Sequence, residues 1–293
     1  MTLLSTAGVF PPTQNAPPLS EPLFRALRDF IYEKTGIYFQ DKKHYLLEGR
    51  VSKRLHLLGL KSYEEYLQLL KYSSSREQEL QFLYDVVTIN ETFFFRNSSQ
   101  LEVMEHSLIP EMVSAKGTAG FTSLRIWSAA CSTGEEPYSL ALVYLEKLKP
   151  RFPHLKLEIV GTDISSSVLS RARRGIYSEY SVRNTPKEYL EKYFEKHEGH
   201  FRIREDVKEQ VSFQHLNLYD RSGMHAMKSF DIVLCCNVMI YFDTPSRIQV
   251  VADLHKNLRI GGYLFLGYSE VLHGISSAFR VINFPKTVGY KKE

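Results

Sequence analysis

The first part of the chain repeats apolar residues at the spacing of an amphipathic helix. Between residues 20 and 88 this pattern predicts four helices, which begin near residues 20, 42, 62 and 76. Ser20 with a following proline marks one helix start, and Gly36 and Gly59 mark two ends. Residues 1–19 are instead rich in Pro, Thr, Asn and Ser. We therefore expect a disordered leader over residues 1–19 and a helical domain over residues 20–88.

From residue 89 onward, short apolar runs alternate with helical segments. Strands are expected at 124–127, 157–161, 211–215, 230–236 and 263–266, and helices at 137–148, 165–173 and 245–258. Several runs are apolar throughout, which is typical of parallel strands buried on both faces. Segments 279–282 and 288–291 are expected to form a hairpin at the sheet edge. The pattern predicts an α/β domain over residues 89–293, with a doubly wound, mostly parallel sheet.

One connection is too long for a simple crossover between parallel strands. Nearly fifty residues separate Asp163 from the strand at 211–215, and a crossover helix needs fewer than half of them. The surplus, at about 175–210, contains an expected helix at 186–194 and a possible strand pair, 200–204 with 210–213. Insertions at the ligand edge of such a sheet often determine specificity. We therefore expect an inserted subdomain that chooses the substrate.

The turn after the first expected strand carries the most informative chemistry. Residues 128–139 read Ser-Ala-Ala-Cys-Ser-Thr-Gly-Glu-Glu-Pro-Tyr-Ser and open a helix, which is typical of a nucleotide-cofactor site. The turn has one glycine, Gly134, and no Gly-Lys-Ser/Thr, so a phosphate cradle is excluded. Glu135 and Glu136 would repel a pyrophosphate. The expected ligand carries a nucleoside and a positive charge, and S-adenosylmethionine fits that description.

Polar residues also follow three other expected strands. Asp163 either accepts hydrogen bonds from ribose hydroxyls or caps a helix, and its register with the Gly134 turn favours the ribose. Asn217 and Leu218 either contact the adenine edge or form a turn. Residues 237–241, Asn-Val-Met-Ile-Tyr, resemble the Asn/Asp-Pro-Pro-Tyr motif of amino-methyltransferases. They lack its prolines and are longer by one residue, which argues against a nucleic-acid amine as substrate.

Composition narrows the class of protein. A net charge of +4 is too small for a nucleic-acid coat, and no apolar run reaches the roughly 20 residues of a membrane span. Three cysteines without metal-ligand spacing, and scattered histidines, argue against disulfides and metal sites. We expect a reduced, cytoplasmic protein without a metal.

The second helix places five cations within a sector of about 120°, which is either a solvated face or a docking surface for an acidic partner: Lys42, Lys43, Arg50, Lys53 and Arg54.

Four motifs together resemble the chemotaxis receptor methyltransferases, the CheR family. They are 90–96 (Asn-Glu-Thr-Phe-Phe-Phe-Arg), 128–139, 161–164 and 237–242, and the resemblance covers about residues 20–291. It implies a protein-glutamate O-methyltransferase that converts receptor glutamates to methyl esters and S-adenosylmethionine to S-adenosylhomocysteine. The implied partner is the cytoplasmic helical bundle of the receptors. The implied protein is a monomer that neither binds nucleic acid nor inserts into the membrane.

The resemblance also implies roles for individual residues. Cofactor contacts would come from Asn90, Thr92, Arg96, Ala129, Glu135, Asp163, Asn217, Leu218, Asn237 and Val238. Arg96 and Tyr241 would position the substrate carboxylate, and Glu135 would face the cationic end of the cofactor. The cationic second helix would dock on the receptor.

The inserted subdomain is relevant to how a protein of this family would recognise its receptors. Some members of the CheR family grip a C-terminal receptor tether there, and those members carry a longer hairpin loop. Residues 193–201 are about three residues shorter, so we expect activity that does not depend on a tether. Two other functions stay open: a methyltransferase for nucleic acid or a small molecule, and a non-catalytic adaptor that senses S-adenosylmethionine.

Overall fold

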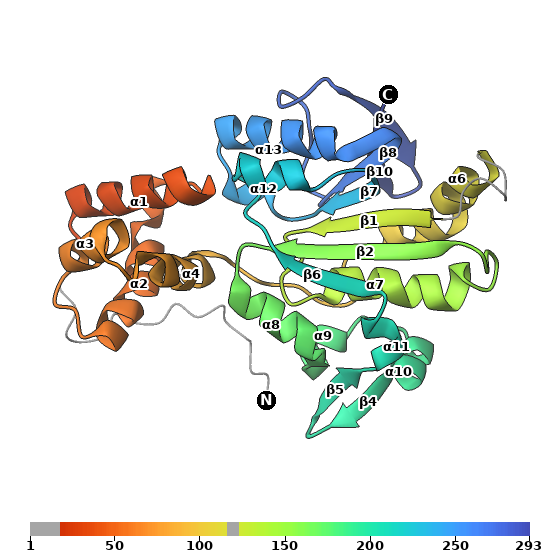
Figure 1. The fold of residues 1–293 in the computed structure, drawn as a ribbon, viewed down its shortest axis with the longest axis horizontal. Coiled ribbons are helices and arrows are strands. Elements are labelled where there is room, and N and C mark those ends of the chain that lie inside the picture. The colour runs from red at the N-terminus through yellow and green to blue at the C-terminus, as the bar shows by residue number, and fades with distance from the viewer. Residues whose placement is uncertain (1–17, 116–122) are drawn as a thin grey trace. The chain divides into compact units, whose positions relative to one another are not determined.

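The computed structural model describes residues 18–115 and 123–293 (Figure 1). Most of the expected leader, residues 1–17, lies outside these ranges. The chain divides into two compact units, residues 1–89 and 90–293, which are described separately below. None of the described helices is both long and apolar enough to cross a membrane.

The first unit contains all four helices that the apolar spacing predicts. They are α1 (Glu21–Thr35), α2 (His44–Leu58), α3 (Tyr63–Tyr72) and α4 (Arg76–Val87), and a 3-10 turn at Asp41–Lys43 precedes α2. Gly36 and Gly59 follow α1 and α2 with φ of 71° and 67°, a left-handed conformation that glycine adopts without strain. The Oγ of Ser62 accepts a hydrogen bond from Glu65 N at 3.2 Å and so caps α3. Ser20 precedes α1, but its side chain makes no capping hydrogen bond.

The second unit is built on a seven-stranded sheet in the order β6-β2-β1-β7-β8-β10-β9 (Figure 1). The strands are β1 (Ser123–Ala129), β2 (Lys156–Asp163), β6 (Val211–His215), β7 (Phe230–Cys235), β8 (Leu258–Leu266), β9 (Phe279–Phe284) and β10 (Thr287–Lys292). The first five in this order pair in parallel, and the β9–β10 hairpin pairs antiparallel at the edge. This arrangement confirms the predicted α/β fold with a mostly parallel sheet.

Helices cover both faces of this sheet. In Figure 1, α7 (Glu135–Val143) and α8 (Ser166–Arg174) lie on one side, and α12 (Arg221–Ala226) and α13 (Thr244–Asn257) lie on the other. A π-helical turn, Tyr144–Leu148, continues α7. Sequence patterns predicted α7, α8 and α13. They missed α5 (Ser98–Val103), a π-helical turn at Met104–Leu108, and α6 (Ile109–Ala115).

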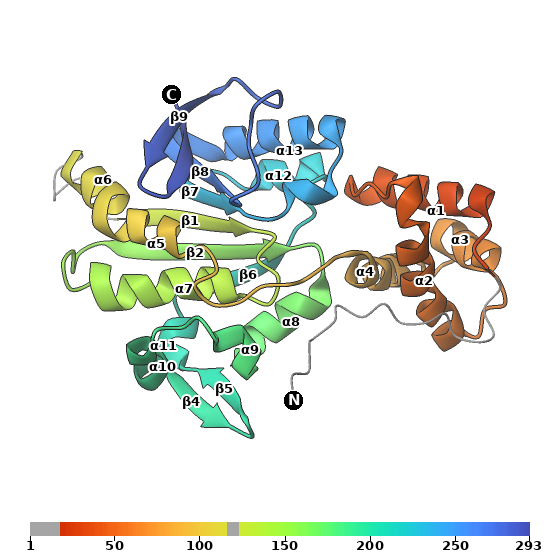
Figure 2. The ribbon, with the colours of Figure 1, turned by 180° about the vertical axis from the view of Figure 1, so that it is seen from behind.

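The insertion after α8 forms a separate three-stranded antiparallel sheet, β3-β5-β4 (Figure 2). Its elements are β3 (Ile176–Tyr177), α9 (Glu179–Val182), α10 (Lys187–Tyr193), β4 (Phe194–His197), β5 (His200–Ile203) and α11 (Glu205–Lys208). The predicted pairing of 200–204 with 210–213 is wrong. Glu198 and Gly199, with φ of 47° and 76°, form a tight turn that pairs β5 with β4, while residues 211–215 join the main sheet.

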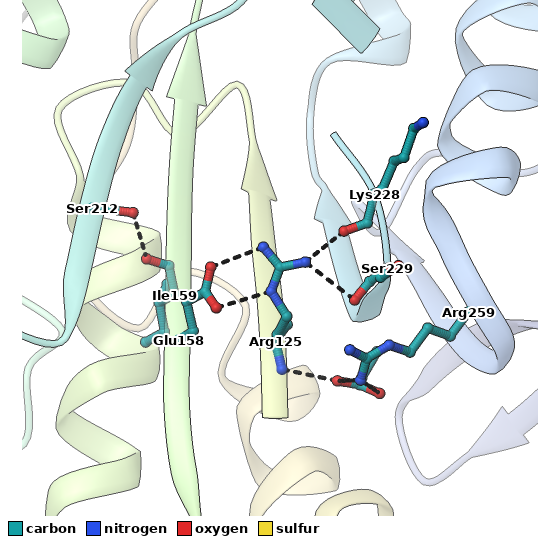
Figure 3. Close-up of polar contacts among 8 residues, drawn as sticks. Arg125, Glu158, Ile159, Ser212, Lys228, Ser229 and Arg259 are labelled. Atoms are coloured by element: carbon teal, nitrogen blue, oxygen red, sulfur yellow. Dashed lines mark hydrogen bonds and ion pairs between the residues drawn. The ribbon is translucent and has the colours of Figure 1, made fainter. Parts of the chain in front are cut away.

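A polar network joins four strands at the amino end of the sheet (Figure 3). The Arg125 guanidinium donates two hydrogen bonds of 2.9 Å to Glu158 and a third to the Lys228 carbonyl. The carboxylate of Asp231, which is 1% exposed, accepts from Arg125 N at 2.9 Å and from Arg259 at 3.0 Å. These contacts fix β1, β2, β7 and β8 at the end opposite the Gly134 turn.

Candidate functional site

The turn after β1 lies across the carboxyl end of β2. Cys131 N donates to the Thr162 carbonyl at 2.8 Å, and Ser132 N donates to Asp163 Oδ2 at 2.9 Å. Ala129 ends β1 and is 1% exposed. The structure therefore brings Ala129 and Asp163, which lie 34 positions apart in the chain, to one edge of the sheet.

The backbone of this turn is held in an uncommon conformation. Ala130 and Ser132 have φ of 60° and 50°, values that residues other than glycine seldom adopt. Gly134 has φ of 92°, and a Cβ there would lie 2.9 Å from the Cβ of Ala172. Only glycine allows the turn to approach α8 this closely. The turn is thus a fixed, side-chain-poor surface, which suits the close approach of a ligand.

Asp163 is buried at 5% exposed and accepts from Ser132 N and Ser165 N, both at 2.9 Å. Burial raises the pKa of its carboxyl, and these backbone hydrogen bonds partly offset that rise. The residue that caps α8 is Ser165 rather than Asp163, because Ser165 Oγ accepts a hydrogen bond from Val168 N at 3.3 Å. Three backbone N–H groups act on this carboxylate, which is fewer than its lone-pair sites, so a ribose hydroxyl remains a compatible partner.

The two glutamates at the start of α7 have different surroundings. Glu135 is 1% exposed, and its Oε2 accepts from Thr133 Oγ1 at 2.6 Å. Glu136 is partly exposed, and its two carboxylate oxygens accept from Ser128 Oγ at 2.7 Å and Asn97 Nδ2 at 3.4 Å. Restricted solvation raises the pKa of Glu136, while the charge of Arg96 acts to lower it. The family resemblance assigns a cofactor contact to Glu135, which stays a prediction, and Glu136 is the more exposed of the two residues.

The segment before α5 runs beside the Gly134 turn. The Asn90 carbonyl accepts from Ser132 Oγ at 3.1 Å, and Phe95 N donates to Ser139 Oγ at 3.0 Å. Phe94 is fully buried, whereas Thr92, Phe93 and Phe95 are partly exposed. Arg96 is also partly exposed, and its Nη1 donates to the Glu91 carbonyl at 2.6 Å. Three predicted residues, Asn90, Thr92 and Arg96, therefore lie on a segment that contacts the turn.

A second loop follows β7, next to β1 in the sheet, where the chain changes direction across the sheet. Asn237 has φ of 62°, and its N donates to Glu270 Oε2 at 2.7 Å. Glu270, which is 7% exposed, also accepts from Gly267 N at 2.8 Å and Ile240 N at 3.3 Å. Val238 is buried at 8% exposed, and Tyr241 is partly exposed. Glu270 was not predicted as a site residue, although it follows β8 as the other motifs follow their strands.

Asn217 and Leu218 follow β6, on the far side of β2 from β1. Asn217 is partly exposed and its Oδ1 accepts from Tyr219 N at 3.0 Å, so it does form a turn. Leu218 is buried at 6% exposed. Their contact with adenine stays a prediction.

The five cations of the predicted docking surface fall into two groups. Lys42, Lys43 and Lys53 are exposed. Arg50 Nη1 donates to the Val87 carbonyl at 2.6 Å, and Arg54 pairs with the buried Glu79 at 2.8 and 2.7 Å. The two arginines therefore stabilise the helical unit itself, and the lysines are the more exposed part of the surface.

The thiols are unsuited to nucleophilic chemistry. Cys131 and Cys235 are buried, Cys236 is partly exposed, and all three are free. Loss of solvation is the largest of the effects that raise the pKa of each thiol well above its ordinary value. Because the thiolate is the reactive form, Cys131 is suited to packing as a small residue rather than to nucleophilic attack.

These residues place carboxylates, amides and one arginine around a glycine-containing turn at the carboxyl edge of the sheet. Glu136 and Asp163 are acids that suit a cation and a sugar hydroxyl, and they disfavour a phosphate chain. The donor set therefore fits S-adenosylmethionine, which carries an ammonium, a sulfonium and a ribose.

Comparison with known families identifies both units. Residues 22–88 match the model described as "CheR methyltransferase, all-alpha domain". Residues 90–288 match "CheR methyltransferase, SAM binding domain", so the second unit is an S-adenosylmethionine-binding domain.

Full-length relatives agree with the family models. The chain is 38% identical to chemotaxis protein methyltransferase 2 of Vibrio cholerae over 270 residues, 92% of each chain. It is 36% identical to the chemotaxis protein methyltransferase of Borreliella burgdorferi, covering 83% of this chain and 86% of the relative. It is 34% identical to chemotaxis protein methyltransferase 1 of Pseudomonas aeruginosa, covering 92% and 97%. By motif, fold and sequence, the chain belongs to the CheR methyltransferase family.

Proposed function

We propose that this protein methylates glutamate carboxylates of chemotaxis receptors with S-adenosylmethionine, and that it does so without a receptor tether. The observation that carries the proposal is the position of Glu136. Glu136 is a partly exposed residue, the charge of Arg96 acts on its carboxyl, and Glu136 Oε1 accepts a hydrogen bond from Ser128 beside the Gly134 turn. A cationic cofactor with a carboxylate of its own suits such a pair of charges.

The cofactor contacts that we propose follow from this geometry. Glu136 takes the place of Glu135 at the cationic end of the cofactor, and Asp163 receives the ribose. Asn90, Thr92, Ala129, Asn237 and Val238 line the crevice, and Asn217 with Leu218 lies toward the adenine. Arg96 serves the methionine end and, with Tyr241, orients the substrate carboxylate.

The reaction needs orientation more than acid or base catalysis. When bound, S-adenosylmethionine supplies an electrophilic methyl group. A substrate glutamate has an ordinary pKa of about 4.3 and is ionised at neutral pH. Glu136 and Asp163 would hold S-adenosylmethionine, which would supply the methyl group, and the products would be a glutamate methyl ester and S-adenosylhomocysteine. Arg96 and Tyr241 act by holding the carboxylate in line and displacing water.

The inserted subdomain supports independence from a tether. β4 and β5 are joined by a turn of two residues, Glu198 and Gly199, which is the shortest common hairpin connection. A hairpin this short offers little loop surface to a peptide. Receptor contact would instead come from the exposed lysines Lys42, Lys43 and Lys53 of the helical unit, against an acidic surface.

One assay tests the proposed activity. The protein is incubated with tritiated S-adenosylmethionine and receptor-enriched membranes, and base-labile methyl esters are counted. We expect label in receptor esters, and a fall in kcat/KM for Tyr241→Phe with little change in cofactor affinity. Label in nucleic acid or in a small molecule would contradict the proposed substrate. Cofactor binding without transfer would point to the adaptor function.

A second measurement tests the tether. Calorimetry with a C-terminal receptor peptide should show no specific binding, and receptors that lack the C-terminal segment should be methylated at the same rate as intact ones. Tight binding of the peptide would refute independence from the tether and leave the methylation itself intact.

A further inference from the structure

Arg183 has aromatic rings on both faces of its guanidinium. It follows α9, and its Cζ lies 3.7 Å from the ring centre of Phe93 and 3.6 Å from that of Tyr180. Two rings at such distances cannot share one face, so they enclose the guanidinium between them. We call Phe93, Tyr180 and Arg183 the arginine sandwich.

The sandwich joins two segments that are distant in the sequence. Phe93 belongs to the segment before α5, and Tyr180 belongs to α9 in the insertion. A backbone hydrogen bond of 2.9 Å from Phe94 N to the Ser181 carbonyl connects them. Tyr180 Oη donates to Glu91 Oε1 at 3.1 Å, which fixes the second ring. The guanidinium is therefore held in place before any partner arrives.

Covering both faces leaves only the edge of the guanidinium available. The five N–H donors lie in that plane, and one nitrogen donates to the Tyr180 carbonyl. Among the ion pairs of residues 18–115 and 123–293, none includes Arg183. Arg54 and Arg125, in contrast, each make a bidentate pair with a glutamate. Arg183 is an exposed, pre-oriented fork without a carboxylate.

The sandwich lies next to the proposed methyl-transfer site. Arg96 Cζ lies 5.7 Å from the centre of the same Phe93 ring, so two guanidinium groups share one aromatic side chain. The charge of Arg96 acts on the Glu136 carboxyl, which assigns Arg96 to the cofactor end. Arg183 follows α9 and places a second positive charge on the insertion.

We infer that Arg183 binds a second carboxylate of the protein substrate, an acidic side chain near the glutamate that is methylated. This inference rests on the proposed function and assigns part of the substrate choice to the insertion. The fork geometry and the aromatic stacking are suited to one carboxylate held edge-on. The methionine carboxylate of the cofactor has the same chemistry, and the experiment separates the two sources.

The test compares three variants on a purified cytoplasmic receptor fragment. Arg183→Ala removes the fork, Arg183→Lys keeps the charge without the planar geometry, and Arg174→Ala removes one exposed charge from α8 as the control. We expect Arg183→Ala to raise KM for the fragment about tenfold, the effect of losing roughly 1.4 kcal/mol of binding. Arg183→Lys should recover only part of this loss, and Arg174→Ala should match the wild type. Cofactor affinity in calorimetry should not change.

A coupling experiment guards against a merely structural effect. Acidic residues of the fragment, other than the methylated one, are replaced singly by their amides. For one of these fragments, Arg183→Ala should cause no further rise in KM, because the partner is already absent. If Arg183→Ala proves unstable in urea, the KM values for the same amide fragments are compared between Arg183→Lys and the wild type.

Several outcomes would overturn the inference. An unchanged KM in Arg183→Ala would remove Arg183 from substrate binding, and weaker cofactor affinity with unchanged KM would assign it to the cofactor. Equal losses on every amide fragment would mean that the sandwich only joins α9 to its neighbour. A wild-type protein that methylates no receptor fragment would overturn the proposed function and this inference together.

Discussion

Glu135 and Glu136 are neighbours in the chain, yet their side chains lie in different surroundings. Successive residues of a helix point about 100° apart, so the two carboxylates accept hydrogen bonds from different groups. The sequence shows that two acids stand at the start of α7, but the phase of the helix depends on how its apolar residues pack on the sheet. That packing is a tertiary property, which the sequence pattern does not show. The assignment of Glu135 came from the family resemblance and stays a prediction.

The pair offers a matched test at this position. Glu136→Gln removes the charge that we assign to the cationic end of the cofactor, and Glu135→Gln removes the charge next to it. We expect cofactor affinity to fall by 10-fold or more in Glu136→Gln, since hydrogen bonds to charged groups contribute about 1.5–3 kcal/mol. Calorimetry should find Glu135→Gln within a few-fold of the wild type. The reverse ranking would return the role to Glu135.

The same carboxyls predict how cofactor binding depends on pH. Burial raises the pKa of both Glu136 and Asp163 in the free protein. A bound cation favours the ionised form of Glu136, so binding lowers the pKa of this carboxyl. When the pH is close to the raised pKa of the free protein, cofactor binding therefore releases protons. Affinity should therefore fall as the pH decreases through the raised pKa of Glu136. Calorimetry in buffers of different ionisation enthalpy measures the released protons, and proton uptake on binding would contradict this prediction.

At the scale of elements, the strands and the loops that follow them were predictable for a simple reason. Buried parallel strands are apolar throughout, and the small or polar residues at 128–134, 163 and 237 stand where each run ends. The order of strands then brings β2, β1 and β7 together. Helices α5 and α6 were missed because their short runs are interrupted by a π-helical turn, which breaks the 3.6-residue period. The pairing of β5 was missed because a two-residue turn was not recognised.

Glu270 and Asp231 allow the two ends of the sheet to be compared. Each is a buried carboxylate that accepts backbone hydrogen bonds, Glu270 at the carboxyl end of the strands and Asp231 at the amino end. Replacing either by its amide should lower the free energy of unfolding in urea by about 1–3 kcal/mol, because backbone donors lose an acceptor. Glu270→Gln should also weaken cofactor binding through the Asn237 loop. Asp231→Asn should leave that affinity unchanged, and equal effects on binding would argue against a local role for Glu270.

At the scale of the whole molecule, the residues proposed to bind the cofactor all lie in the second unit, between Asn90 and Val238. The exposed lysines proposed for docking lie in the first unit. A chain of residues 90–293 should therefore bind S-adenosylmethionine within a few-fold of full-length affinity. It should lose most of its methyl transfer to receptors. Full transfer by the shortened chain would show that α2 does not dock the substrate.

The buried thiol of Cys131 can report how often the Gly134 turn opens. Its side chain is 2% exposed beneath the backbone that bonds to Thr162, so a reagent reaches the sulfur only when that backbone opens. At a fixed reagent concentration, the rate of thiol modification then measures how often this backbone opens. Added S-adenosylmethionine should slow this reaction in proportion to occupancy. A modification rate that does not change when the cofactor is added would mean that the turn opens independently of the ligand.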